Sequence, residues 1–292
     1  MNLYNITINW VYLALLSALF FGLAPVFLKA SMKRADAWVS FTLAVTVQTI
    51  LLLLFYPGKA RAFFSAFRGR GLQNWVPLIL IALTFLLSAF FFFLALQRSQ
   101  VSQAYSLFSF SRLLLPLLFF LLLKEGMAMK NWYALFLGLA GLILLLIGSE
   151  GKTEKSWLLF GLLSIVLELT GRLLLRRFGQ AYEEGFRILF ESFFAAVCGW
   201  IVLLIRRRGA QLKRVTVYQG FFMAAAGLLT GFAVIFLNRG LSNNAGIVRT
   251  LVSLALPVSL LTSAALLREK LAGKAVLGMI CLTAGLMLPS LI

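Results

Sequence analysis

Runs of about twenty apolar residues recur along the whole chain, and they constrain its fold more than any other feature of the sequence. A helix needs about 20 apolar residues to cross the hydrocarbon core of a bilayer. A soluble helical protein would instead carry a polar stripe along each helix, whereas most of these runs are apolar all round. We therefore predict an all-α integral membrane protein with ten spans, at residues 8–30, 37–56, 75–96, 101–123, 130–148, 156–178, 184–205, 217–238, 245–267 and 274–291.

The net charge of +18 raises the question of a nucleic-acid partner. Most Lys and Arg, however, lie in the breaks between spans, as at Arg206, Arg207 and Arg208, where they meet anionic headgroups. We therefore expect membrane lipids as partners and no nucleic acid. The sequence has no histidine and no clustered metal ligands, so we also expect no metal, no cofactor and no enzymatic activity.

The two halves of the chain resemble one another. Three patterns recur in register: Ala104 with Pro116 and Ala245 with Pro257; Lys124-Glu125 with Lys130 and Arg268-Glu269 with Lys274; Trp10 with Ser17 and Trp157 with Ser164. We predict two five-span units, residues 1–148 and 156–292, joined by a polar linker at residues 149–155. Because five is odd, the two units enter the membrane from opposite sides. Inverted repeats of this kind are typical of secondary transporters that work by alternating access.

The motifs Leu123-Lys124-Glu125 and Leu267-Arg268-Glu269 each close a proline-containing span and precede the glycine-bearing last span of their half. In this order the chain resembles, over nearly its whole length, the EamA-type ten-helix branch of the drug/metabolite transporter (DMT) superfamily. The resemblance implies two inverted five-helix bundles around a central cavity. Spans one, three, four, six, eight and nine would surround the substrate, and spans five and ten would be more peripheral.

The resemblance also implies a multi-pass protein of the bacterial cytoplasmic (inner) membrane with both termini in the cytoplasm. The loops on the side of the N-terminus carry fewer Lys and Arg than the opposite loops, which favours the reverse orientation. Family members move amino acids, nucleotide-related metabolites, sugar phosphates, organic cations and drugs, so the resemblance does not name the substrate. The chain departs from the family in having Phe20-Phe21-Gly22 where a tryptophan is common, and in carrying charge within span six.

Charged residues inside the predicted spans are the first candidates for a functional site, because a charge at the bilayer centre costs about 2.5–3.5 kcal/mol on insertion scales. Six remain once the charges near the span ends are set aside as loop residues: Arg112, Glu168, Arg172, Arg187, Glu191 and Arg249. Glu168 with Arg172, and Arg187 with Glu191, are four residues apart and can meet on one helix face. These pairs either neutralise one another and lock the bundle, or their carboxylates carry a coupling proton.

Arg112 and Arg249 have no partner at such a spacing and lie on spans four and nine, the equivalent helices of the two units. A guanidinium can hold a carboxylate or phosphate by two parallel hydrogen bonds. The side chains predicted to share a face with them are Tyr105 and Ser109 on span four, and Gly246 and Ser253 on span nine. We predict substrate contacts from this set, the alternative being that Arg112 or Arg249 pairs with Glu168 or Glu191 across helices.

Aromatic residues complete the predicted site. Of the run from Phe90 to Phe93, one or two must face inward, with Phe91 our candidate, and Tyr105, Phe108 and Trp10 could join them; packing against lipid is the ordinary alternative. We predict a secondary transporter, acting as a monomeric exporter of an amino acid or another solute with a carboxylate or phosphate. An exporter of organic cations or drugs is the alternative within this class, and a lipid flippase is the alternative outside it.

Overall fold

The computed structural model describes most of the chain. The described residues are 3–32, 35–58, 75–148, 156–206, 212, 215–241, 245–270 and 272–291. The predicted linker at residues 149–155 lies outside them.

The described part of the chain is all-helical, which confirms the predicted fold class. The helices are α1 (Leu3–Met32), α2 (Ala37–Phe55), α4 (Val76–Arg98), α5 (Val101–Leu123), α6 (Met129–Gly148), α7 (Ser156–Phe178), the 3-10 turn η2 (Gly179–Ala181), α8 (Glu184–Ile205), α10 (Val217–Leu241), α11 (Ala245–Val252), α12 (Ala255–Leu267) and α13 (Gly273–Leu291). Among the described residues, nine segments are long and apolar enough to cross a membrane, α11 and α12 together forming one of them, and Gly273–Pro289 is a shorter apolar helix. The protein is therefore a multi-pass membrane protein.

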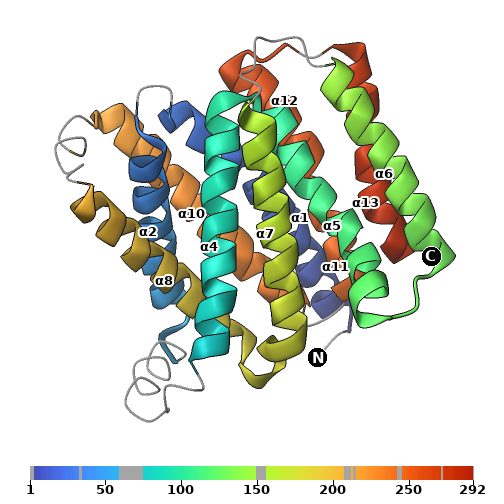
Figure 1. Cartoon of the computed structure of the whole chain (residues 1–292), viewed down its shortest axis with the longest axis horizontal. Helices are drawn as coiled ribbons and strands as arrows, with labels where there is room; N and C mark the ends of the chain where they lie inside the picture. The colour runs from blue at the N-terminus through green and yellow to red at the C-terminus, as the bar shows by residue number, and fades with distance from the viewer. Residues whose placement is uncertain are drawn as a thin grey trace.

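Helix packing follows the two halves of the chain (Figure 1). Helix α1 packs extensively on α10, and α7 packs extensively on α4, which is the same pairing with the two halves exchanged. In the same way α2 contacts α8, α5 contacts α12, and α6 packs along α13. Chain directions in Figure 1 are opposite for α1 and α7, the first helices of the two halves. The five-helix units with an inverted relation account for this pattern.

The ends of α5 and α12 show how closely the two halves correspond. Both helices stop at a basic residue with a left-handed backbone, Lys124 with φ 54° and Arg268 with φ 57°. The next amide bonds back into the helix, from Glu125 N to Phe119 O at 3.3 Å and from Glu269 N to Ser263 O at 3.4 Å. A residue in this conformation ends a helix by turning the chain out of it. The cap therefore places Glu125 and Glu269 at equivalent positions.

The ninth span differs from its counterpart. Helix α5 runs without interruption through Pro116, whereas the predicted span 245–267 is divided into α11 and α12 at Ser253 and Leu254. Proline has no amide hydrogen and clashes with the carbonyl four residues before it. Pro257 thereby frees the Ser253 carbonyl, which accepts the amide of Leu256 instead, at 3.1 Å. The break positions Arg249 in the last turn of the short helix α11.

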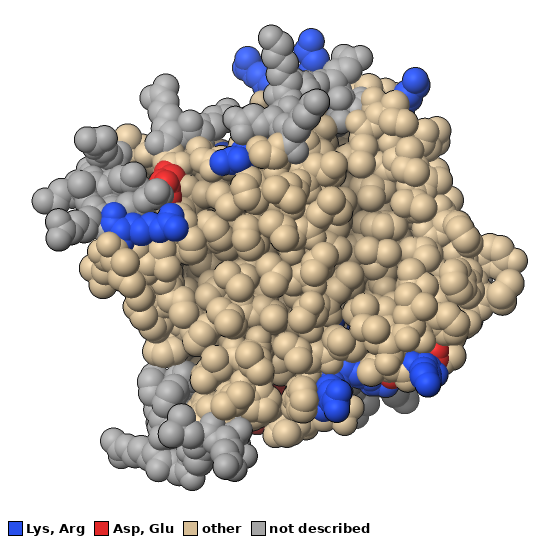
Figure 2. All heavy atoms as spheres, viewed as in Figure 1, with Lys and Arg blue, Asp and Glu red and all other residues tan. Residues whose placement is uncertain are grey.

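The surface reflects a membrane environment. Figure 2 shows Lys and Arg near the upper and lower edges of the visible face, with a broad uncharged band between them. Many large apolar side chains in the spans are exposed, among them Leu54, Phe136 and Leu204. Such a band suits a hydrocarbon surrounding, since lipid tails and these side chains are equally apolar.

Candidate functional site

Helix α7 brings together the first charged pair. The Arg172 guanidinium lies 2.9 Å (Nη2) and 3.0 Å (Nε) from the same oxygen of Glu168, Oε1. The other oxygen, Oε2, lies 3.5 Å from the Ser88 hydroxyl of α4, and the guanidinium stacks over Phe85 at 5.3 Å. Glu168 is largely buried and Arg172 is half exposed. Both oxygens of this carboxylate therefore have partners.

Helix α8 carries a looser pair. Arg187 Nε lies 3.3 Å from Glu191 Oε1 and its Nη2 lies 3.7 Å from Glu184 Oε1, so one guanidinium is divided between two carboxylates. Neither Arg187 Nε nor Glu191 Oε1 forms a well-directed hydrogen bond with any described residue, although both atoms are buried. Glu191 also lies within electrostatic range of Glu168 and Arg172. The four predicted residues of α7 and α8 thus form one charged cluster beside α4.

Arg112 and Arg249 are not part of this cluster. Both side chains are exposed, and neither makes an ion pair or a hydrogen bond with the part of the chain that the structure describes. The described contacts therefore contain no pairing of Arg112 or Arg249 with Glu168 or Glu191 across helices. Helix α11 packs mainly on α1 and α13, while α12 contacts α5, so packing does not place the two guanidinium-bearing helices in extensive contact.

The neighbours predicted for the two arginines have different surroundings. Tyr105 is buried and within electrostatic range of Arg112, and Ser109 is buried one turn away. On the other helix Gly246 is exposed, whereas the Ser253 hydroxyl is buried and donates to Thr250 O at 2.6 Å. Ser253 therefore uses its hydroxyl in the helix break.

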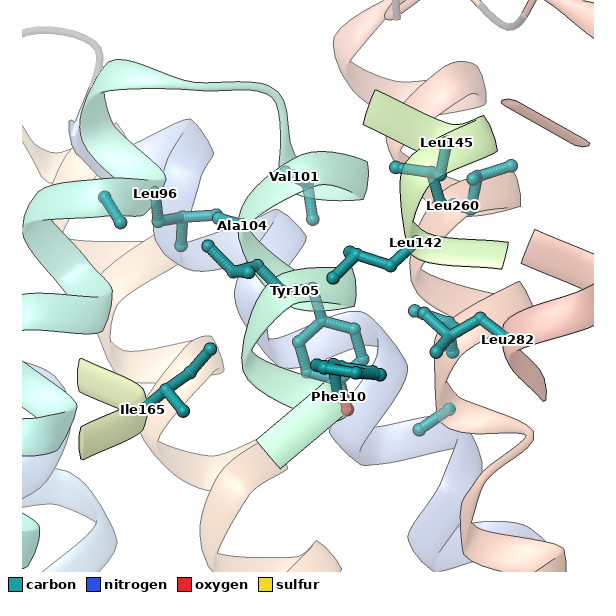
Figure 3. Packing of buried hydrophobic residues seen from close by; sticks show 14 of the residues in the cluster. Leu96, Val101, Ala104, Tyr105, Phe110, Leu142, Leu145, Ile165, Leu260 and Leu282 are labelled. Carbon is teal, nitrogen blue, oxygen red and sulfur yellow. The ribbon is translucent and has the colours of Figure 1, made fainter. Parts of the chain in front are cut away.

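The aromatic residues belong to two groups. The Phe91 ring lies parallel to that of Phe160 of α7 at 6.0 Å, so it packs on the neighbouring helix. Phe92 contacts Phe108 at 4.9 Å and Tyr105 at 6.4 Å. Figure 3 shows Tyr105 within the central cluster, where side chains of α4, α5, α6, α7, α12 and α13 meet. Of the predicted aromatics, Phe108 and Tyr105 are thus the ones nearest Arg112 along α5.

Two polar contacts between helices were not predicted. The Ser88 and Ser164 hydroxyls bond reciprocally to each other's backbone carbonyls at 2.9 Å, and Glu269 accepts the Val101 amide. The repeated patterns contain Ser164 and Glu269, so the sequence signalled that these residues matter without naming their partners. Among the described residues no group of three His, Cys, Asp or Glu side chains is placed to hold a metal ion.

The fold is that of a multi-pass membrane protein with charged residues inside its spans. Residues 8–147, which hold the first five spans, match the model of the EamA-like transporter family, and this match indicates a membrane transporter of the DMT superfamily. Nineteen chains of solved structures match. One crystal structure of a protein shares 16% identity with a TM-score of 0.62, covering 94% of this chain and 96% of its own, which shows the fold alone. Comparison with curated proteins found no match.

Proposed function

We propose that the protein is a secondary transporter that exports a small metabolite bearing a carboxylate or a phosphate, by alternating access. The observation that carries this proposal is that Arg112 and Arg249 are exposed within spans and have no ion-pair partner among the described residues. A cation at that depth is costly unless it faces water or a partner. An anionic solute supplies such a partner.

The charged cluster of α7 and α8 supports a substrate with both signs of charge, such as an amino acid. Arg172 and Glu191 are near enough to interact, so the cluster could exchange partners when a zwitterion or a proton arrives. Glu168 and Glu191 are the carboxylates that we propose for proton coupling. We further propose that the exporter works as a monomer in a bacterial inner membrane.

The proposal is tested by a thermal-stability screen of the purified protein in detergent against amino acids, phosphorylated metabolites, organic cations and lipids. A ligand that binds the folded state alone raises its stability by RT ln(1 + [L]/Kd). We expect a rise in Tm with one anionic or zwitterionic class. Arg249→Ala should weaken that binding at least about ten-fold, because hydrogen bonds to charged groups contribute about 1.5–3 kcal/mol.

Lys130→Ala is the matched control, since it removes a cation from the second residue of α6, at the end of its span rather than deep within it. It should leave the ligand-induced rise in Tm unchanged. A rise with organic cations or with lipids alone would replace the anion proposal by a drug exporter or a lipid flippase. A rise that survives Arg249→Ala and Arg112→Ala would remove both arginines from the site.

A further inference from the structure

Glu269 joins the two halves of the protein at one face. Its carboxylate accepts the backbone amide of Val101, the first residue of α5, with 2.9 Å to Oε1 and 3.1 Å to Oε2. The first amides of a helix have no partner within it and carry partial positive charge. A carboxylate from the end of α12 therefore fastens the start of α5 across the boundary between the halves.

The helix ends around this contact pack on one another. Lys29 near the end of α1 donates from Nζ to Leu96 O of α4 at 2.9 Å. Leu96, Ser99 and Val101 are buried. The ends of α1, α4 and α12 thus meet at the start of α5, with Glu269 bonded to the amide in their midst.

The counterpart of Glu269 has a different partner. Glu125 follows the same left-handed cap at the end of α5, but it lies 3.4 Å from Arg176 of α7, and both side chains are about half exposed. Arg176 stands as far after Trp157 as Lys29 stands after Trp10, so these two bases are repeat counterparts. The two equivalent acids therefore have different kinds of partner. Glu269 binds a buried helix amide, and Glu125 pairs with the half-exposed base near the end of the first span of the second half.

We propose that Glu269 is a latch of alternating access, which holds its face closed while it binds the Val101 amide and opens that face when it transfers to Lys29. The Glu125–Arg176 pair shows the released arrangement at the opposite face. The proposal rests on the proposed alternating-access function and identifies a contact that distinguishes its two states. Inverted repeats support it, since each half adopts in one state the arrangement of the other half in the opposite state.

The test measures distances by double electron–electron resonance in protein without substrate. Spin labels at Gln97→Cys and Lys270→Cys lie on either side of the latch. Both residues are exposed, and neither takes part in the bond between Glu269 and Val101. Labels at Ala128→Cys and Arg177→Cys span the opposite face. Cys198 and Cys281, the native cysteines, are replaced by Ser.

Glu269→Ala should raise the population with separated labels at 97 and 270 about ten-fold or more, since a charge-assisted hydrogen bond is lost. Glu269→Gln retains an acceptor for the amide but no charge for Lys29, so its shift should be smaller. Lys29→Gln keeps a donor for Leu96 O but removes the charge that would receive Glu269, so it should reduce the separated population. Glu125→Ala is the matched comparison: it removes an exposed ion pair, so any opening at 97–270 should be much smaller than in Glu269→Ala.

An unchanged 97–270 distance in folded Glu269→Ala protein would reduce Glu269 to a helix cap, as would equal opening in Glu125→Ala. If Glu269→Ala does not fold, Lys29→Gln decides, since an unreduced separated population in that variant would show that Glu269 does not transfer to Lys29. These distances need no substrate. If an anionic ligand raises Tm but the 97–270 distance does not change in the Glu269 variants, only the latch proposal is rejected. If the distance changes but no anionic ligand raises Tm, only the proposed substrate class is rejected.

Discussion

The interfaces of α1 with α10 and of α4 with α7 pair equivalent helices of the two halves, but the side chains in them differ in chemistry. In the first, the Ser17 hydroxyl donates to Ala233 O at 2.8 Å. In the second, the Ser164 hydroxyl donates to Ser88 O at 2.9 Å. Ser17 and Ser164 stand equally far after Trp10 and Trp157, so equivalent hydroxyls donate in the two halves, although their acceptors, Ala233 and Ser88, are one helical turn apart in the repeat.

Around this shared bond the surroundings diverge. At α1 and α10 the rings of Phe20, Phe232 and Phe236 contact one another at 5.8–6.2 Å. At α4 and α7 the same depth holds Glu168 and Arg172, whose counterparts in α1 are Phe21 and Pro25. The repeat accounts for the shared packing of both interfaces, and that packing does not require the charge on one of them. The polar interface is therefore the better candidate for function.

The largest expected effect concerns a third interface, between α6 and α13, which serves as the reference for the stability of the other two. A Cβ added to Gly278 would lie 2.5 Å from Gly141 O and from Leu145 N, so backbone would have to move. Gly278→Leu should destabilise the fold by about 3 kcal/mol, at the upper end of overpacking costs. The measurement is unfolding by sodium dodecyl sulfate in mixed micelles.

Gly126→Leu is the control for this substitution, because no described residue lies within 4 Å of a Cβ at that position. Its stability should stay within about 0.5 kcal/mol of the parent protein, as at most surface sites. Equal stability of the Gly278 and Gly126 variants would show that α6 and α13 are not held in close contact.

The second prediction removes the charge that distinguishes the α4–α7 interface. Glu168→Leu leaves the Arg172 guanidinium without its ion-pair partner, and should cost about 2 kcal/mol, since Arg172 is half exposed and part of its charge stays solvated. Glu168→Leu combined with Arg172→Leu should recover most of that loss. A double-variant cycle gives the coupling, and strictly additive single effects would mean that the pair contributes nothing to stability.

The sequence predicted the spans and the repeat because both are written in local patterns: apolar runs have the length of a bilayer, and Trp, Pro and Glu recur at fixed spacing. It also predicted that Glu168 can meet Arg172, because four residues make one helical turn. Contacts between helices could not be predicted from the sequence. Nothing near Glu269 in the sequence indicates Val101 as its partner, and nothing near Ser164 indicates Ser88, because these pairs depend on how distant helices pack.

The smallest effect tests whether the shared hydroxyl bonds are worth the same in both interfaces. Ser17→Ala removes the one hydroxyl bond of its pair and should cost about 1 kcal/mol, within the range measured for hydrogen bonds between membrane helices. Ser164→Ala should cost about the same, because it also removes one hydroxyl bond while the Ser88 hydroxyl still donates to Ser164 O at 2.9 Å. The double variant of Ser88 and Ser164 to Ala should then cost about twice as much as Ser17→Ala. Should Ser164→Ala alone already cost as much as the double variant, the two hydroxyls act as a single unit, and the polar interface gains no redundancy from its second serine.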